Sequence, residues 1–334
     1  MSSKFLHSLF VSFILVLFCG ASQAASYKYI RIGQKDDAQT KSVAGIAMMG
    51  GGDDLDEAFR WLCAKANGGD FLILRAHGDD EYNSYVNGLC KANSVATLII
   101  PDRDAAQSPA VAEIIRHAEA VFIAGGDQAN YIRFWRGTPV QDAINQNIAE
   151  GKPIGGTSAG LAVQGEFAYS ALNDPDDSEL HSPEALANPY HNQVTVVRDF
   201  LKIPLLQNTL TDSHFAKRDR MGRTLVFLAR IMQDGWSKSP REIAIDEKSA
   251  LLVESDGKAV VVGSGRGAYF LRPTQPPDTC QEKVPLSFSN ISVYNAPSGT
   301  HFDLPSWKGT SGASYLLSVE HGIIHSTQLD GAVY

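Results

Sequence analysis

Apolar residues along this chain form short continuous runs, separated by stretches in which they recur every three or four positions. The runs predict buried β-strands at 43–49, 71–75, 96–101, 120–124 and 153–156. The stretches between them predict helices, including 55–66, 110–118 and 140–150, the first capped by Asp53 and Asp54 and the last closed by Gly151. Strands and helices in alternation predict an α/β fold with a mostly parallel sheet flanked by helices.

The second half of the chain has a different pattern. A strand-like run covers 188–201, and a helix is expected from after Ala216 to about Gln233. Residues 241–272 alternate apolar runs with Gly-rich turns, which predicts two or three antiparallel strands at the edge of the sheet. We therefore expect one α/β domain over 25–275, with a small β-rich extension over 276–334 packed on it.

The N-terminus has the layout of a secretory signal peptide. Lys4 precedes an apolar run at 5–18, and small residues end at Ala24, where we expect cleavage. The run is too short to span a bilayer comfortably, and a bulky Phe18 disfavours lipid attachment at Cys19. Residues 1–24 thus predict a secreted or periplasmic protein that is free of the membrane after cleavage.

Composition narrows the function classes. The 334 residues are 44% hydrophobic and 20% charged, enough for a large core, and the net charge of -8 argues against nucleic acid or an anionic membrane as partner. No Cys-x-x-Cys pair occurs in the sequence, so a structural zinc site and thioredoxin-like chemistry are both poorly supported. In an oxidising compartment the favoured disulfide joins Cys63 to Cys90, the nearest pair in sequence, and leaves Cys280 free, although spacing does not fix the connectivity.

The sharpest motif is Gly-Gly-Thr-Ser-Ala-Gly at 155–160, between a predicted strand and an apolar helix. Small residues around Ser158 suit a nucleophile elbow, a tight turn that lifts the hydroxyl out of the sheet and points the next N–H, that of Ala159, at the developing oxyanion. The alternative is a glycine-rich turn that binds phosphate or only packs closely.

A second loop, Gly-Gly-Asp-Gln at 125–128, also follows a predicted strand, so both loops should meet at one crevice. The N–H of Gly126 or Asp127 could supply the second oxyanion donor, and Gln128 a hydrogen bond to substrate. The less favoured alternative is a turn in which Asp127 caps the helix that begins at Ala129, and the two roles are compatible.

Two further segments carry candidate chemistry. His214 is a candidate general base, and the arginines after it can form forks for carboxylates or an ordinary charged helix face. One member of the acidic pair Asp246 and Glu247 could orient His214, but the residues alone do not choose between them. A metal site built from His77 and nearby acids is conceivable, but a polar turn is favoured.

Together these four segments resemble the cyanophycinase family of serine peptidases, relatives of the aspartyl dipeptidases with a class I glutamine-amidotransferase-like, flavodoxin-like fold. The resemblance covers about 42–275. It implies a nucleophile at Ser158, a general base at His214 and an orienting acid at Glu247, with no metal or cofactor. It also implies a substrate site at Gln128, Asp212, Ser213, Arg218, Arg220 and Arg223. The implied activity is hydrolysis of cyanophycin, an aspartate polymer with arginine on its side-chain carboxylates, through an acyl-enzyme to β-aspartyl-arginine.

One position departs from the family pattern. Ser213 stands where the family usually has glutamine, so the substrate could be another β-aspartyl peptide. The second candidate is an α/β-hydrolase-type esterase. In that fold the acid precedes the histidine in sequence, so the base would be His301, His321 or His325 and the acid Asp246 or Glu247. A secreted binding protein that has lost catalysis is a third reading. The oligomeric state stays open, with a homodimer as one option.

Overall fold

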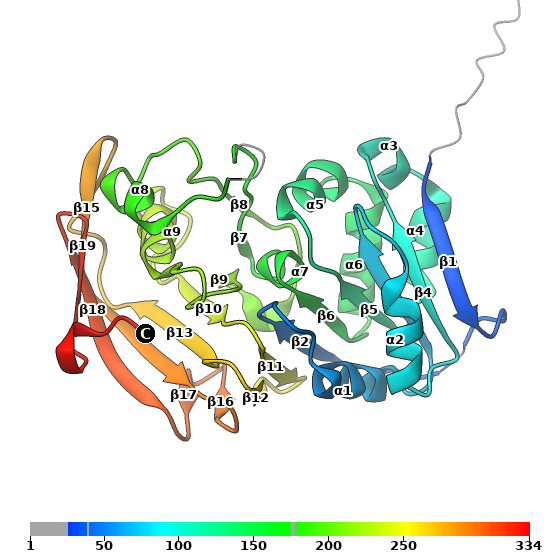
Figure 1. The fold of residues 1–334 in the computed structure, drawn as a ribbon. Helices are drawn as coiled ribbons and strands as arrows, with labels where there is room; N and C mark the ends of the chain where they lie inside the picture. The colour runs from blue at the N-terminus through cyan, green and yellow to red at the C-terminus, as the bar shows by residue number, and fades with distance from the viewer. Residues whose placement is uncertain (1–25, 39, 175–177) are drawn as a thin grey trace, which may run out of the picture.

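The computed structural model describes residues 26–38, 40–174 and 178–334, which form two β-sheets side by side (Figure 1). Five neighbouring strands of the first sheet run parallel, in the order β4-β3-β5-β6-β2. Antiparallel strands extend this sheet at both ends. Its strands in spatial order are β1 (Lys28–Gly33), β4 (Ser94–Ile99), β3 (Asp70–Arg75), β5 (Ala120–Ile123), β6 (Ile154–Thr157), β2 (Gly45–Met49), β11 (Ser249–Glu254), β12 (Lys258–Gly263), β16 (His301–Asp303) and β17 (Lys308–Gly309).

Helices cover both faces of the parallel strands. One face packs against α1 (Asp56–Ala66) and α2 (Glu81–Leu89). The other face packs against α4 (Pro109–Arg116), α5 (Gln128–Trp135) and α6 (Pro139–Ala149), with the short α3 (Arg103–Ala106) beside them. Successive residues of a strand pack on opposite faces of the sheet. Met48 lies in the core with α4, α5 and α6, and Met49 lies in the core with α1 and α2. A strand buried on both faces has no polar side, which is why these segments read as continuous apolar runs.

The second sheet surrounds a smaller parallel core of β7, β9 and β10. Helices α8 (Ser182–Ala187) and α9 (Met221–Gln233) pack on one face of it. In spatial order the strands are β19 (Ile323–Ser326), β18 (Ala313–Glu320), β15 (Val284–Ala296), β13 (Ala268–Pro273), β10 (Arg241–Ile245), β9 (Thr209–Asp212), β7 (Phe167–Tyr169) and β8 (Val196–Arg198), while β14 (Thr279–Gln281) pairs with β15. The remaining elements are α7 (Ala159–Ala162) and two short 3-10 turns at Pro204–Leu206 and Leu329–Gly331.

The α/β class is confirmed, and three local expectations need correction. The run 188–201 is mostly loop, with only Val196–Arg198 paired at the edge of the second sheet. Residues 241–272 form four strands divided between the two sheets, because β10 and β13 join the second while β11 and β12 continue the first. Asp53 and Asp54 do not cap α1. Asp53 forms an ion pair with Lys248 instead, and Asp54 accepts a hydrogen bond from the Tyr82 hydroxyl.

The expected disulfide is present and joins Cys63 of α1 to Cys90 at the end of α2, with their Cα atoms 5.8 Å apart. Cys280 is a buried free thiol. Of the helices in the described part of the chain, none has the length and apolar character to cross a membrane. The predicted signal peptide, 1–24, lies outside the described residues.

Candidate active site

Five loops meet where parallel strands of the two sheets end. In the first sheet β2, β5 and β6 lead into the loops that begin at Gly50, Ala124 and Ser158. In the second sheet β9 and β10 lead into the loops that begin at Ser213 and Asp246. The carboxyl ends of parallel strands are where open α/β sheets place their ligands. The structure therefore collects the loops that carry the sequence motifs at one place.

Ser158 occupies a sharp turn between β6 and α7. Its φ of 53° and ψ of -117° lie outside the regions that most residues adopt, as a nucleophile elbow requires. A Cβ atom on Gly156 would lie 2.5 Å from the Gly160 carbonyl oxygen, and one on Gly160 would lie 2.0 Å from the Ile123 carbonyl oxygen. The glycines of the motif are thus needed because backbones pass this close together.

Three side chains form one chain of hydrogen bonds. The Ser158 Oγ lies 2.7 Å from the His214 Nε2, and the His214 Nδ1 lies 2.7 Å from the Glu247 Oε1. The His214 side chain is 8% exposed and that of Glu247 21%, so water reaches the carboxylate more readily than the imidazole. A hydroxyl, an imidazole and a carboxylate in this order are the parts of an acyl-transfer triad.

The surroundings of the imidazole favour its neutral form. Burial lowers the pKa of His214, Glu247 opposes that shift, and the positive charges of Arg218 and Arg220 add to it. A neutral imidazole can accept the serine proton, whereas an imidazolium cannot. The environment thus favours His214 as a base.

The triple glycine after β2 aligns the other loops, a role that the sequence reading missed. The carbonyls of three successive residues accept backbone N–H groups from the triad loops. That of Met49 accepts from Ser158 at 3.1 Å, that of Gly50 from His214 at 2.8 Å, and that of Gly51 from Lys248 at 2.9 Å. A glycine run read only as a turn gives no signal of this role, because the partners are distant in sequence.

The other acid and the other histidines lie elsewhere. The Asp246 Oδ1 accepts the Lys217 N–H at 2.9 Å and so fixes the loop after His214. The three histidines of the esterase alternative are exposed on the C-terminal strands or the turn between them: His301, His321 and His325. The geometry therefore favours the order serine, histidine, acid of the cyanophycinase-like reading over the α/β-hydrolase order.

A cleft of about 660 Å³ opens beside Ser158. Four predicted substrate residues line it: Gln128, Ser213, Arg218 and Arg220. Five further polar residues line it that the sequence reading did not single out: Arg133, Tyr169, Asp174, Ser178 and Glu179. The last three come from the loop after β7, whose composition indicates only a polar loop and not where it folds.

The predicted oxyanion donors lie on the same cleft wall. Gly126, Asp127 and Ala159 line the cleft with Ser158. Within the described residues the backbone N–H groups of these three have no acceptor, so they are available to a ligand. The Asp127 Oδ1 also accepts the Ala129 N–H at 2.8 Å, so the capping role of Asp127 is present as well.

Asp212 and Arg223 do not line the cleft. The Arg223 side chain is 1% exposed and forks onto the Asp212 carboxylate, with the Nη2 2.7 Å from both oxygens. Burial by itself would raise the pKa of Asp212, but Arg223 and Arg220 outweigh it and hold the pKa below its ordinary value. These two residues form a buried ion pair beneath the site, and neither is placed to touch substrate.

Glu179 neutralises the arginines that do reach the cleft. Its Oε2 pairs with Arg220 at short range and lies 3.7 Å from the Arg218 Nη1 and 3.6 Å from the Arg223 Nη1. Burial would raise the pKa of Glu179, but these guanidinium groups hold it below its ordinary value. The arginine cluster already contains a carboxylate of the protein itself.

No group of three or more His, Cys, Asp or Glu side chains in the described segments is arranged to hold a metal ion. The His77 ring packs edge-on against Phe134, with ring centres 6.2 Å apart. The Arg75 guanidinium binds the carbonyls of His77 and Asp79, so this loop is a hydrogen-bonded polar turn.

Known proteins resemble this chain in sequence. The cyanophycinase of Trichormus variabilis is 28% identical over 218 residues, 64% of this chain and 66% of the relative. That of Synechococcus elongatus is 29% identical over 218 residues, 63% of this chain and 60% of the relative. The match thus spans slightly less than two thirds of these relatives.

Two solved structures show a weaker likeness. A peptidase from an acI-B1 Actinobacterium has a TM-score of 0.47 and 17% identity, over 67% of this chain and 89% of that one. A putative peptidase E protein from Listeria monocytogenes has a TM-score of 0.44 and 13% identity, over 67% of this chain and 100% of that one.

The profile of peptidase family S51 matches residues 53–261. This segment is more than half of the chain and includes Ser158, His214 and Glu247. The chain therefore belongs to peptidase family S51.

Proposed function

We propose that this protein is an exported serine peptidase that hydrolyses cyanophycin to β-aspartyl-arginine dipeptides. The observation that carries the proposal is the hydrogen-bonded chain from Ser158 through His214 to Glu247, which opens on a cleft lined by charged groups of both signs. The cyanophycinase relatives support the choice of substrate. An intact chain of hydrogen bonds also favours an enzyme over a binding protein that has lost catalysis.

The reaction follows from the geometry. His214 takes the proton of Ser158 through Nε2 while the Oγ attacks the peptide carbonyl carbon. The N–H of Ala159 and that of Gly126 or Asp127 receive the oxyanion. The C–N bond then breaks as His214 returns the proton to the departing amine, which leaves an acyl-enzyme. Water attacks this ester by the same route and frees the acid and Ser158.

The cleft suits a substrate with both charges. Arginine that is joined to an aspartate side chain through its α-amino group keeps a free carboxylate and a guanidinium. The cleft offers Arg133 and the half-exposed Arg218 to the carboxylate, and guanidinium groups bind carboxylates as two-pronged forks. The carboxylates of Asp127 and Asp174 supply negative charge on the same walls.

The test is incubation of the purified mature protein with insoluble cyanophycin, followed by mass spectrometry of the soluble products. Release of β-aspartyl-arginine by the parent, and its absence with Ser158→Ala, would support the proposal. If the polymer stays intact while Ser158 still reacts with a serine-directed covalent inhibitor, the substrate is wrong and the nucleophile stands. Ser213→Gln then tests whether restoring the usual family residue restores cleavage.

Export is proposed from the N-terminal sequence and is supported by the Cys63–Cys90 disulfide, because structural disulfides persist in oxidising compartments. N-terminal sequencing of the protein recovered from outside the cytoplasm should begin just after Ala24. Recovery of the full chain from the cytoplasm would contradict export. Light scattering of the same sample tests whether the protein is a homodimer.

A further inference from the structure

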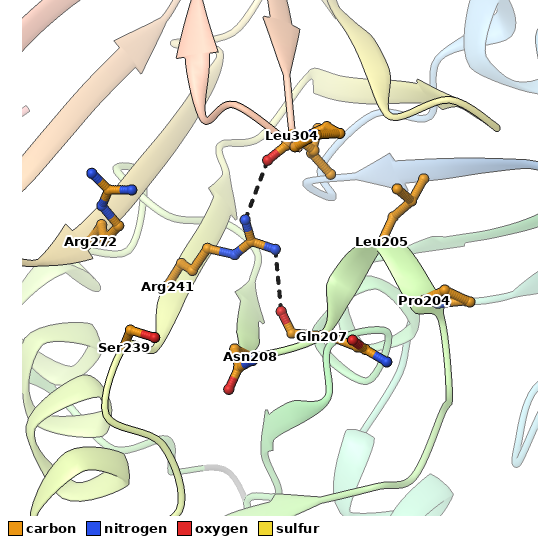
Figure 2. A pocket seen from close by; sticks show the side chains of 9 residues that line it. Pro204, Leu205, Gln207, Asn208, Ser239, Arg241, Arg272 and Leu304 are labelled. Atoms are coloured by element: carbon orange, nitrogen blue, oxygen red, sulfur yellow. Dashed lines mark hydrogen bonds between the residues drawn. The ribbon is translucent and has the colours of Figure 1, made fainter.

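A second concavity of about 420 Å³ lies at the other end of β10 from Glu247 (Figure 2). Arg241 begins β10 and Arg272 lies near the end of β13, and both line the concavity. None of the residues that line it is acidic. The catalytic cleft shares no lining residue with it.

Among the described residues neither Arg241 nor Arg272 forms an ion pair. Arg241 bonds only to uncharged acceptors, and Figure 2 shows its guanidinium held between the carbonyls of Leu304 and Gln207, each 3.3 Å away. It also packs over the Trp307 ring at 4.6 Å. These contacts fix the orientation of the group and leave its charge unneutralised.

The strand register brings the two charges together. Glu242 pairs with Leu271 in the antiparallel ladder, which places Arg241 opposite Arg272 on one face of the sheet. Like charges directly opposite each other destabilise a sheet. Burial and the neighbouring Arg272 both lower the pKa of Arg241. A bound anion would relieve this repulsion.

Two neutral side chains add hydrogen-bond donors. The Asn208 Oδ1 accepts from the Ser237 hydroxyl at 2.9 Å, which leaves the Asn208 amide N–H₂ free to donate. The Ser239 hydroxyl has no acceptor among the residues described. The adjoining hollow is lined by two acids, Glu166 and Asp199, and by Lys202, and the Glu166 Oε2 accepts the Asn208 N–H at 2.6 Å. Within the concavity itself, the charged side chains are both cationic.

We propose that this concavity is a binding site for a small oxyanion, a carboxylate or a phosphate group, held by Arg241 and Arg272 with Asn208 and Ser239. Guanidinium forks match both kinds of anion. The site is independent of the proposed peptidase function, because it lies at the opposite end of the strand and uses none of the residues of the cleft.

The experiment is isothermal titration of the full mature chain at low ionic strength, with citrate in one series and inorganic phosphate in another. We expect one of the two anions to bind with 1:1 stoichiometry, and the stronger ligand to identify the preferred group. Arg241→Gln and Arg272→Gln should each weaken that binding about tenfold, the loss expected for one charge-assisted contact. Because Arg272 is exposed, its variant should fold even if that of Arg241 does not.

Two matched variants separate this site from general charge effects. Arg60→Gln removes the same charge from an exposed position on α1, and Arg218→Gln removes it from the catalytic cleft. Both should bind the anion as the parent does. The proposal would be overturned if neither anion binds with 1:1 stoichiometry. Loss of binding in Arg218→Gln, or parental binding in Arg272→Gln, would also overturn it.

Discussion

The hydrogen bond from His214 to Glu247 determines which nitrogen of the imidazole acts as the base. A carboxylate only accepts, so the Nδ1 carries the proton that it shares with Glu247 at 2.7 Å. The Nε2 is then free to accept from the Ser158 hydroxyl. His214 also adopts a positive φ of 47°, a conformation that its hydrogen bonds to neighbouring loops maintain. The tautomer and the orientation of the base are thus set by its surroundings.

The lowered pKa of His214 predicts where activity is lost in acid. A base whose pKa lies below the ordinary value of about 6.5 stays neutral in mildly acidic solution, so the acid limb of kcat/KM should lie below that pH. Arg218→Gln removes one of the charges that lower the pKa and should move the limb to higher pH. A pH–rate profile of both proteins checks this. A parental limb at or above pH 6.5, or identical limbs, would contradict it.

Glu179 predicts a selectivity change. Its carboxylate competes with any substrate carboxylate for Arg218 and Arg220, so Glu179→Gln should lower the KM for a peptide with a free carboxylate about tenfold while kcat changes little. Glu184→Gln, an exposed change in the neighbouring α8, is the matched control. Steady-state kinetics measures the effect. A raised KM in Glu179→Gln alone would mean that Glu179 binds a cationic group of the substrate instead.

At the scale of elements, the glycine loop after β2 should be intolerant of side chains. A Cβ atom on Gly51 would lie 2.4 Å from the His214 Cε1, and the φ of +91° disfavours any other residue. Gly51→Ala should therefore lower kcat about a hundredfold by displacing the base. Gly88→Ala in α2, where the new methyl group meets nothing within 4 Å, is the control. Circular dichroism should show both proteins folded, and a parental kcat in Gly51→Ala would refute the alignment role.

Strand β10 carries a buried acid that predicts a pH-dependent stability. Burial raises the pKa of Glu242 well above its ordinary value, and the Thr224 hydroxyl donates to its Oε1 at 3.0 Å. The folded protein keeps a proton that the unfolded chain releases above about pH 4.5, so the stability from this group is complete below that pH and falls as pH rises toward the folded pKa. The free energy of unfolding of Glu242→Gln, relative to that of the parent, should therefore be higher at pH 8 than at pH 5. Urea unfolding of both proteins at pH 5 and pH 8 measures this. The same stability difference between variant and parent at the two pH values would contradict the prediction.

The sequence was sufficient for elements whose pattern is local. The strands that became β2 to β6 were predicted because double burial makes them apolar throughout, and the Ser158 turn because glycines must flank it. The division of 241–272 between two sheets was missed, since each strand pattern is the same in either sheet. Arg223 has the same side chain as Arg218, and only the tertiary structure shows that Asp212 takes it out of the cleft. Placement depends on partners that are remote in sequence.

At the scale of the molecule, the last residue of the chain reaches back to the catalytic loop. The Tyr334 hydroxyl accepts the Met221 N–H at 2.8 Å and donates to the Asp219 Oδ1 at 3.1 Å. Its ring packs edge-on against Phe215, the residue after His214. The C-terminal segment therefore supports the loop that carries the base.

Tyr334→Phe should destabilise the protein by about 1 kcal/mol, because the Met221 N–H loses its acceptor. The turnover number should remain near the parental value, since the bonds of His214 itself are unchanged. Tyr29→Phe removes a hydroxyl from an exposed side chain on β1 and is the control. Urea denaturation compares the two, and equal stabilities would show that the C-terminal contact contributes nothing.

The completion of both sheets by C-terminal strands has a consequence for biosynthesis. Strands β16 and β17 extend the first sheet beyond β12, and β15, β18 and β19 extend the second beyond β13 (Figure 1). A ribosome that adds about 5–20 residues per second needs several seconds for the roughly 60 residues that follow β13. A chain that folded during synthesis would expose the outer edges of β12 and β13 throughout that interval, and other chains can pair with such edges. Aggregation during synthesis is therefore the failure that this arrangement of strands invites.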